Sequence, residues 1–227
     1  MRVLAIDTAL AACSAAVLDT AKESLLASES VPMTRGHAEA LMPLLARVMK
    51  ASGLTFSNID RVAVTTGPGS FTGLRVGLSA ARGIALAIEK PIVGVSTLSA
   101  YAVPHIAGNS PVRVVAAIDA RHEHVYLQVF GPGGRTVAAP RLATLSDAVR
   151  AAAESSSRIV GSAALAVAAG MAKTDPVPVL VDERAAPDIT WVARMGAVVP
   201  EGKSPPKPQY LRAPDAQPQH AAQLPRR

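Results

Sequence analysis

The chain has 227 residues, of which 49% are hydrophobic and 18% charged, so it can bury a sizeable core and lacks the composition of a disordered protein. No run approaches the roughly 18 consecutive apolar residues that a membrane span needs. Asp7 interrupts the apolar start where a signal peptide would still be hydrophobic. The single cysteine, Cys13, excludes an internal disulfide and argues against a cysteine-based zinc site. We therefore expect a soluble, cytoplasmic protein without membrane contacts.

The 23 Lys and Arg residues outnumber the 17 Asp and Glu residues, giving a net charge of +6. An excess of positive charge marks a nucleic-acid binder when the cations form a patch interleaved with aromatic residues. Here aromatic residues make up only 3% of the chain, and the cations are scattered without a run. We interpret the charge as a solubilising surface rather than a track for phosphates.

The first 35 residues contain three strand-like segments joined by short links. Val3–Ile6 and Ser14–Leu18 are apolar runs, and Ser24–Val31 alternates between apolar and polar residues. Three successive strands with short connections predict an antiparallel meander.

From residue 38 the hydrophobic period changes to that of a helix, and strands and helices then alternate to about residue 100. Three meandering strands followed by such an alternation are the layout of a ribonuclease H-like lobe, in which the later strands add in parallel. The predicted elements are a helix over 38–52, a strand over 62–66, a helix from Ser70 to about Glu89, a strand over 92–95 and a third helix capped by Ser96.

A weaker copy of this pattern begins near Val112. A strand to Ile118 ends at Asp119, Val125–Phe130 returns, and further strands are expected near 159–161 and 177–181 with alanine-rich helices before each. We predict an α/β fold of two lobes with mixed central sheets flanked by helices. Residues 1–100 form the first lobe and carry partner-binding helices, 101–212 form a smaller second lobe with a C-terminal return segment, and 213–227 form a flexible proline-rich tail.

The glycine-rich turn at 66–75 is the most informative stretch. Gly67 and Gly69 allow positive φ angles beside Pro68, and the helix that follows presents free N–H groups that favour anions. The spacing matches neither a P-loop, which needs a lysine where Leu74 follows Gly73, nor a dinucleotide fingerprint. Asp7 and Asp119 end the first strand of each lobe, where carboxylates can hold Mg²⁺ beneath phosphates. Asp7, Gly67, Gly69 and Asp119 are thus candidates for a vestigial nucleotide site, and an ATP-dependent small-molecule kinase or ATPase is the alternative function. The turn after Asp7 lacks the glycine- and threonine-rich loop that would wrap phosphates, which favours acids that only cap turns in a scaffold whose pocket has decayed.

Small residues at 69, 73 and 77 keep one face of the second helix slim, while larger apolar residues form another stripe. If such a stripe is exposed, the two helices of the first lobe present an apolar surface, and a partner with a similar pair completes a four-helix bundle. The pattern leaves open which stripe faces outward. The candidate partner interface is Leu41, Leu45, Val48, Phe71, Leu74 and Leu78.

Several segments together resemble the TsaB (YeaZ-like) family over nearly the whole chain. The long Gly-Pro-Gly-Ser-Phe-Thr-Gly-Leu-Arg match is the most specific, and the likeness is densest over residues 1–101. The matching segments are residues 4–8, 35–43, 67–77, 94–98, 119–121 with 125–126, and 208–212.

The resemblance implies a fold of the actin, Hsp70 and sugar-kinase type and a role as the non-catalytic scaffold in threonylcarbamoylation of the adenosine beside the anticodon of tRNA. It implies a partnership with the catalytic paralogue, TsaD, through the two helices of the first lobe. It further implies a homodimer when the protein is alone, a TsaE-type ATPase that joins the complex, indirect contact with tRNA, and no cofactor.

The catalytic paralogue carries a His-x-x-x-His pair that binds a metal, one helical turn apart. The corresponding positions here are Thr97 and Tyr101. A hydroxyl and a phenol do not replace two imidazole ligands, so we predict neither a metal site nor catalysis by this chain. A metallopeptidase, an activity once attributed to relatives, would also need that metal.

Overall fold

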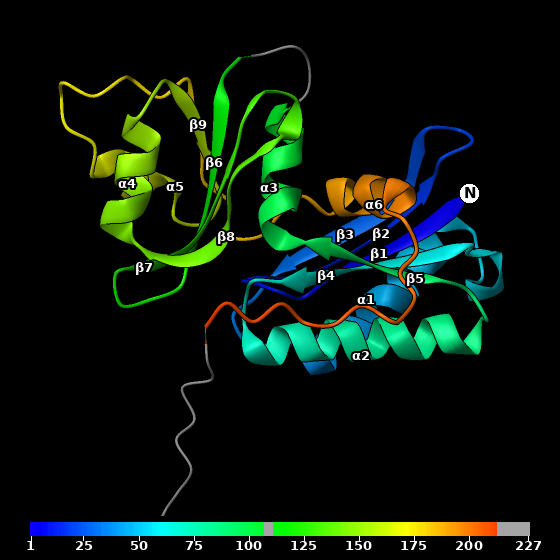
Figure 1. The fold of residues 1–227 in the computed structure, drawn as a ribbon. Helices are drawn as coiled ribbons and strands as arrows, with labels where there is room; N and C mark the ends of the chain where they lie inside the picture. Colours follow the sequence, from blue (N-terminus) through cyan, green and yellow to red (C-terminus); the bar gives the residue numbers. More distant parts are fainter. Residues whose placement is uncertain (107–110, 213–227) are drawn as a thin grey trace, which may run out of the picture.

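The computed structural model describes residues 1–106 and 111–212, which fold into two lobes that each contain a five-stranded mixed sheet (Figure 1). The strand order is β3-β2-β1-β4-β5 in the first sheet and β10-β9-β6-β7-β8 in the second. In both sheets the first three strands pair antiparallel, and the last two add in parallel. The predicted fold class, with its repeated ribonuclease H-like topology, is confirmed.

The first sheet is covered on both faces, and its central strands β1, β2 and β4 are therefore buried at nearly every position. Leu4 and Ile6 point to the face covered by α1 and α2, whereas Val3 and Ala5 point to the face covered by α6 (Figure 1). The elements of this lobe are β1 (Arg2–Asp7), β2 (Ala12–Asp19), β3 (Ser24–Pro32), α1 (His37–Ser52), β4 (Arg61–Gly67), α2 (Phe71–Ala87), β5 (Ile92–Ser96) and α6 (Ile189–Val198), with a 3₁₀ turn at Phe56–Asn58.

The second sheet repeats this layering with smaller residues. Val115 and Ala117 of β6 face α4 and α5, whereas Val114, Ala116 and Ile118 face α3. The elements are α3 (Thr97–Ile106), β6 (Arg113–Asp119), β7 (His124–Phe130), β8 (Thr136–Thr144), α4 (Leu145–Ala153), β9 (Ser157–Val160), α5 (Ala164–Ala169) and β10 (Leu180–Asp182), with a 3₁₀ turn at Pro132–Gly134.

Two elements of the fold were not predicted. Strand β8 contains Pro140, which breaks the usual strand pattern but is tolerated because β8 lies at the sheet edge. Helix α6 is rich in β-branched residues and contains Gly196, whose missing side chain lets the helix approach Ala63 closely. A signal for α6 was present, since Asp188 caps it by accepting a hydrogen bond from the Thr190 N–H at 2.8 Å.

After α6 the chain runs back along the first lobe beside α2 (Figure 1). We call residues 205–212 the C-terminal strap. Its Gln209 N–H donates to the Thr66 carbonyl at 2.7 Å, and Arg82 of α2 donates to the Pro206 carbonyl at 2.5 Å. Residues 189–212, the return segment of the predicted second lobe, therefore pack on the first lobe. The predicted tail at 213–227 lies outside the described residues.

Within the described ranges, none of the helices is both long enough and apolar enough to cross a bilayer.

Candidate functional site

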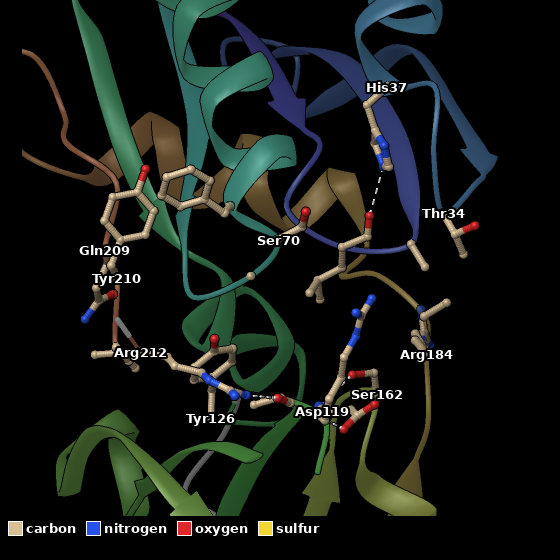
Figure 2. A pocket seen from close by; sticks show the side chains of 18 of the residues that line it. Thr34, His37, Ser70, Asp119, Tyr126, Ser162, Arg184, Gln209, Tyr210 and Arg212 are labelled. Atoms are coloured by element: carbon tan, nitrogen blue, oxygen red, sulfur yellow. Dashed lines mark hydrogen bonds between the residues drawn. The ribbon is translucent and has the colours of Figure 1, made fainter. Parts of the chain in front are cut away.

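A cleft of about 780 Å³ separates the two lobes (Figure 2). In that view Ser70 and Tyr210 lie on the side of the first lobe, and Asp119, Tyr126 and Ser162 lie on the side of the second. The lining comes from the turn after β1, the starts of α1 and α2, the β6–β7 turn, the segment after β10 and the C-terminal strap.

The wall on the first lobe is the turn that connects β4 to α2. Gly67 has a φ of +105°, which only glycine adopts without strain, and its peptide bond to Pro68 is cis. The Ser70 hydroxyl caps α2 by accepting a hydrogen bond from the Gly73 N–H at 3.3 Å, as the sequence predicted. The Ser70 N–H in turn donates to the Ala9 carbonyl at 2.7 Å, so the start of α2 is fixed to the turn after β1.

The small residues of α2 are explained by this same contact. A Cβ atom at Gly69 would overlap the Ala9 carbonyl, and one at Gly73 would overlap the Thr8 carbonyl. Of the two glycines that allow a positive φ beside Pro68, Gly67 adopts one and Gly69 does not, so close backbone approach is the reason for a glycine at position 69. The slim face of α2 therefore packs inside the first lobe.

Asp7 is fully buried beneath this wall and does not line the cleft. Its Oδ1 atom accepts hydrogen bonds from the Thr65 hydroxyl at 2.5 Å and from the Ala9 N–H at 3.0 Å, while Oδ2 has no partner among the described residues. Burial raises the pKa of this carboxyl, only partly offset by these hydrogen bonds. Of the predicted nucleotide-site residues, the structure brings Gly69 and Asp119 to the cleft and leaves Asp7 and Gly67 outside it.

Asp119 lies on the opposite wall, in the tight turn between β6 and β7. Its Oδ1 atom accepts from the Arg121 N–H at 2.8 Å, and its own N–H donates to the Ser162 hydroxyl at 3.1 Å. Residues 121–123 all have positive φ angles, so the turn is held in a conformation that non-glycine residues rarely adopt. The His124 Nδ1 atom lies 2.7 Å from the backbone carbonyl of His122, and no cluster of three metal-ligating residues exists within the described parts of the chain.

His37, the first residue of α1, also lines the cleft. Its Nε2 atom lies 3.0 Å from the Leu10 carbonyl, the contact marked by the upper dashed line in Figure 2. The imidazole is largely buried and ties the helix start to the turn after β1.

Comparisons with known proteins connect this fold to a family. The family model for TsaD, the tRNA N6-adenosine threonylcarbamoyltransferase, matches residues 30–178. The tRNA threonylcarbamoyladenosine biosynthesis protein TsaB of Escherichia coli (strain K12) is 40% identical over 126 residues, 56% of this chain and 53% of that protein. TsaB of Haemophilus influenzae is 36% identical, with 56% of this chain and 52% of that protein covered. The chain thus spans about half the length of these two relatives.

The solved structure of YeaZ from Pseudomonas aeruginosa superposes with a TM-score of 0.68 at 27% identity, over 84% of this chain and 88% of that one. The chain belongs to the family that the TsaD model describes, and its likeness to TsaB and YeaZ proteins marks it as TsaB/YeaZ-like. A second solved structure, of a protein with similarity to YeaZ from Pseudomonas aeruginosa, gives a TM-score of 0.75 at 27% identity over 93% and 99% of the two chains. An uncharacterized protein of Mycobacterium tuberculosis (strain H37Rv) is 34% identical over 95% of this chain and 94% of its own length.

In this member of the family, the two positions predicted to replace the metal-binding histidines lie inside the protein. Thr97 is fully buried at the start of α3, and its hydroxyl has no hydrogen-bond partner among the described residues. The Tyr101 hydroxyl donates to the Arg184 carbonyl at 2.7 Å, and burial raises its pKa well above the usual value. Neither side chain lines the cleft.

The proposed partner interface needs correction. Five of its six residues, the leucines and valine at 41, 45, 48, 74 and 78, are at most 3% exposed. They lie on the stripe of α1 or α2 that packs into the first lobe, so they are core residues of the folded chain. Phe71 alone among the six is exposed, at 38%, and it lies 5.1 Å from the Tyr210 ring with the Arg75 guanidinium 3.7 Å above it.

The outward faces of α1 and α2 are formed by other residues. Met42 on α1 and Leu86 on α2 are large apolar residues that are 53% and 80% exposed. Ser79 and Gly83 are small residues of α2 that are also exposed. A Cβ atom at Gly83 would meet nothing within 4 Å. We call Met42, Ser79, Gly83 and Leu86 the outer helix face.

Sequence reasoning also missed the basic groups of the cleft. Arg121, Arg184 and Arg212 all line it, although they are far apart in the chain. Arg212 belongs to the matched segment at 208–212, so a signal for it existed. Nothing in the sequence around Arg184 indicated that it would meet the other two.

Proposed function

We propose that this chain is the non-catalytic subunit that pairs with a TsaD-type transferase in threonylcarbamoylation of the adenosine next to the anticodon of tRNA. Relatives that are 40% and 36% identical carry the name tRNA threonylcarbamoyladenosine biosynthesis protein TsaB. A transferase of Syntrophobacter fumaroxidans is itself 43% identical over 68 residues, 30% of this chain and 20% of that protein. Support for a helper rather than a second transferase must therefore come from the residues themselves.

The observation that carries the proposal is the state of Thr97 and Tyr101. A metal that takes part in catalysis needs neutral nitrogen or anionic ligands and an open position for the substrate. Here one position is a buried hydroxyl, and the other is a phenol whose hydroxyl donates to the Arg184 carbonyl with its pKa raised by burial. Because these two side chains do not supply the ligands of a catalytic metal, they support a role in which the partner carries out the chemistry.

The outer helix face is the surface we assign to the partner. The region that the TsaD model matches, residues 30–178, includes both α1 and α2. A transferase of this family therefore carries the counterpart of the same helix pair, and two such pairs can pack as four helices. The same face would join two copies of the chain when the transferase is absent. In this proposal the complex works in the cytoplasm, a TsaE-type ATPase joins through it, and contact of this chain with tRNA is indirect.

The test is association with the purified paralogue. The two proteins, mixed at micromolar concentration, are expected to co-elute from a size-exclusion column as a complex distinct from either alone. Separate elution at that concentration would contradict the proposal. Nucleotide titration of the isolated chain addresses the kinase or ATPase alternative, for which turnover of ATP would be required.

A further inference from the structure

The chain connects its two lobes covalently at two places, and the C-terminal strap forms a third connection without a covalent bond. The covalent connections are the step from β5 to α3 and the segment 183–188 between β10 and α6. The strap lies on the first lobe, yet the Arg212 Nη1 atom at its end donates to the Ala120 carbonyl of the second lobe at 2.9 Å. Figure 2 shows Arg184 and Arg212 on opposite sides of the view, so a covalent connection and the strap border the cleft on different sides.

The first lobe holds the strap along its length. The Gln209 N–H donates to the Thr66 carbonyl at 2.7 Å. A Cβ atom at Gly67 would lie 2.9 Å from the Gln209 carbonyl oxygen, and one at Gly94 would lie 2.9 Å from the Pro206 Cβ atom. Because these distances are too short for real side chains, the two glycines form the bed on which the strap rests.

Tyr210 clamps the strap to the start of α2. Its ring lies 5.1 Å from the Phe71 ring, and its hydroxyl accepts a hydrogen bond from Arg75 Nε at 3.2 Å. The Arg75 guanidinium also lies 3.7 Å above the Phe71 ring. Phe71 and Tyr210 are both partly exposed, and ring and cation–π contacts at exposed sites are individually weak. Such a clamp releases at a lower free-energy cost than a buried one.

Arg212 attaches the other end of the strap to a stiff turn. The Ala120 carbonyl that it contacts belongs to the β6–β7 turn, where residues 121–123 all have positive φ angles. Non-glycine residues keep such angles only where their surroundings fix them. The Ala120 N–H donates to the His124 carbonyl at 2.9 Å, which closes the turn. Arg212 therefore anchors the strap to a part of the second lobe that is fixed to its sheet.

We propose that the C-terminal strap is a latch that holds the two lobes at one angle, and that its release widens the cleft. Leu10 packs against the second core on the side of α3, whereas a cavity of about 780 Å³ separates the lobes at the cleft. Tyr210 and Arg212 are two residues apart, and two residues of extended chain span at most about 7 Å. The strap has little slack, so a rotation about the α3 side that opens the cleft breaks the contacts of Tyr210 or Arg212.

Pulsed electron paramagnetic resonance tests the latch, with spin labels on Ser28→Cys in β3 and Ala139→Cys in β8 of the full chain. Both positions are exposed, and the native Cys13 is buried. Dilution with unlabelled chain removes distances between copies. The unmodified strap should give one narrow distribution of label distances. Arg212→Gln loses a charge-assisted hydrogen bond and should raise the population of a second, shifted distance about tenfold. Tyr210→Ala should produce the same second distance.

Lys207→Gln is the matched control, because it removes one positive charge from an exposed residue of the same strap. Its distribution should equal that of the unmodified strap. Tyr210→Phe keeps the ring contact and loses only the hydroxyl, so it should fall between the unmodified strap and Tyr210→Ala, and it tests the clamp without removing a large side chain. A distribution that is equally narrow in all variants would overturn the latch. So would a broad distribution with the unmodified strap, or an equal change in the control. The measurement uses this chain alone, so its result does not depend on whether the chain binds a transferase.

Discussion

Gly83→Arg separates the stability of the folded chain from its association with a partner. Gly83 lies in the interior of α2, is exposed, and has open space where a Cβ atom would stand. Glycine in a helix interior is less favourable than alanine or arginine by about 0.5–1 kcal/mol. The residues three and four positions away, Ser79, Ala80, Leu86 and Ala87, carry no charge that would repel the new arginine.

We therefore expect the variant to be more stable by about 0.5–1 kcal/mol, with Tm raised by roughly 1–4 °C. In the complex, the same side chain would enter a close helix–helix contact and bury an unpaired charge. We expect a loss of affinity of at least about 100-fold, or roughly 2.7 kcal/mol. Thermal unfolding gives the first quantity, and size-exclusion or calorimetric titration with the transferase gives the second.

The matched control is Ala166→Arg, which adds the same side chain to an exposed position of α5 in the second lobe. It should leave the affinity for the transferase unchanged. If Gly83→Arg is folded and binds the transferase as tightly as the unmodified chain, the partner does not occupy the outer helix face.

Three further predictions concern the stability of the folded chain. Leu45→Ala should lower the free energy of unfolding by about 2–5 kcal/mol, measured by urea unfolding, because Leu45 is fully buried in the core of the first lobe. A change below about 0.5 kcal/mol, the effect of a surface substitution, would show that Leu45 is not a core residue. Ser70→Ala should cost roughly 1 kcal/mol through the lost helix cap, and an unchanged unfolding midpoint would contradict the capping role. For Asp7 the folded pKa is raised, so the native state holds the proton more tightly than the unfolded chain. Its stabilising contribution is complete below the unfolded pKa and is lost as pH rises through the folded one. Asp7→Asn should lack this loss, so its stability relative to the unmodified chain should increase with pH across that window, and a constant difference would refute the assignment.

Much of the fold follows from local patterns in the first hundred residues. The buried runs of β1 and β2, the cap at Ser70 and the stop at Gly53 each give an element boundary without reference to the rest of the chain. The second lobe was harder to predict because its helices are short and alanine-rich, and its edge strand β8 contains a proline. Helix α6 could not be placed by pattern alone, since its contacts with β1 and β4 bridge more than 120 residues of sequence.

Local sequence patterns also do not decide which residues form the candidate surfaces. Helical spacing groups Leu41, Leu45 and Val48 on one stripe, but spacing does not say whether that stripe meets the sheet or a partner. The apolarity of the strands beneath decides it, and the stripe packs on Leu4 and Ile6. The three arginines of the cleft meet only through the fold, because they come from a turn, a loop and the returning strap.

The most direct test of the central claim is reconstitution of tRNA threonylcarbamoylation from purified components. The transferase, its activated threonylcarbamoyl donor, the ATPase and substrate tRNA are held constant while this chain is added in increasing amounts. We expect product formation to rise with the chain and to level off near equimolar transferase, with no product when the chain replaces the transferase. Product formed by this chain alone, or a rate that does not respond to its addition, would contradict the account.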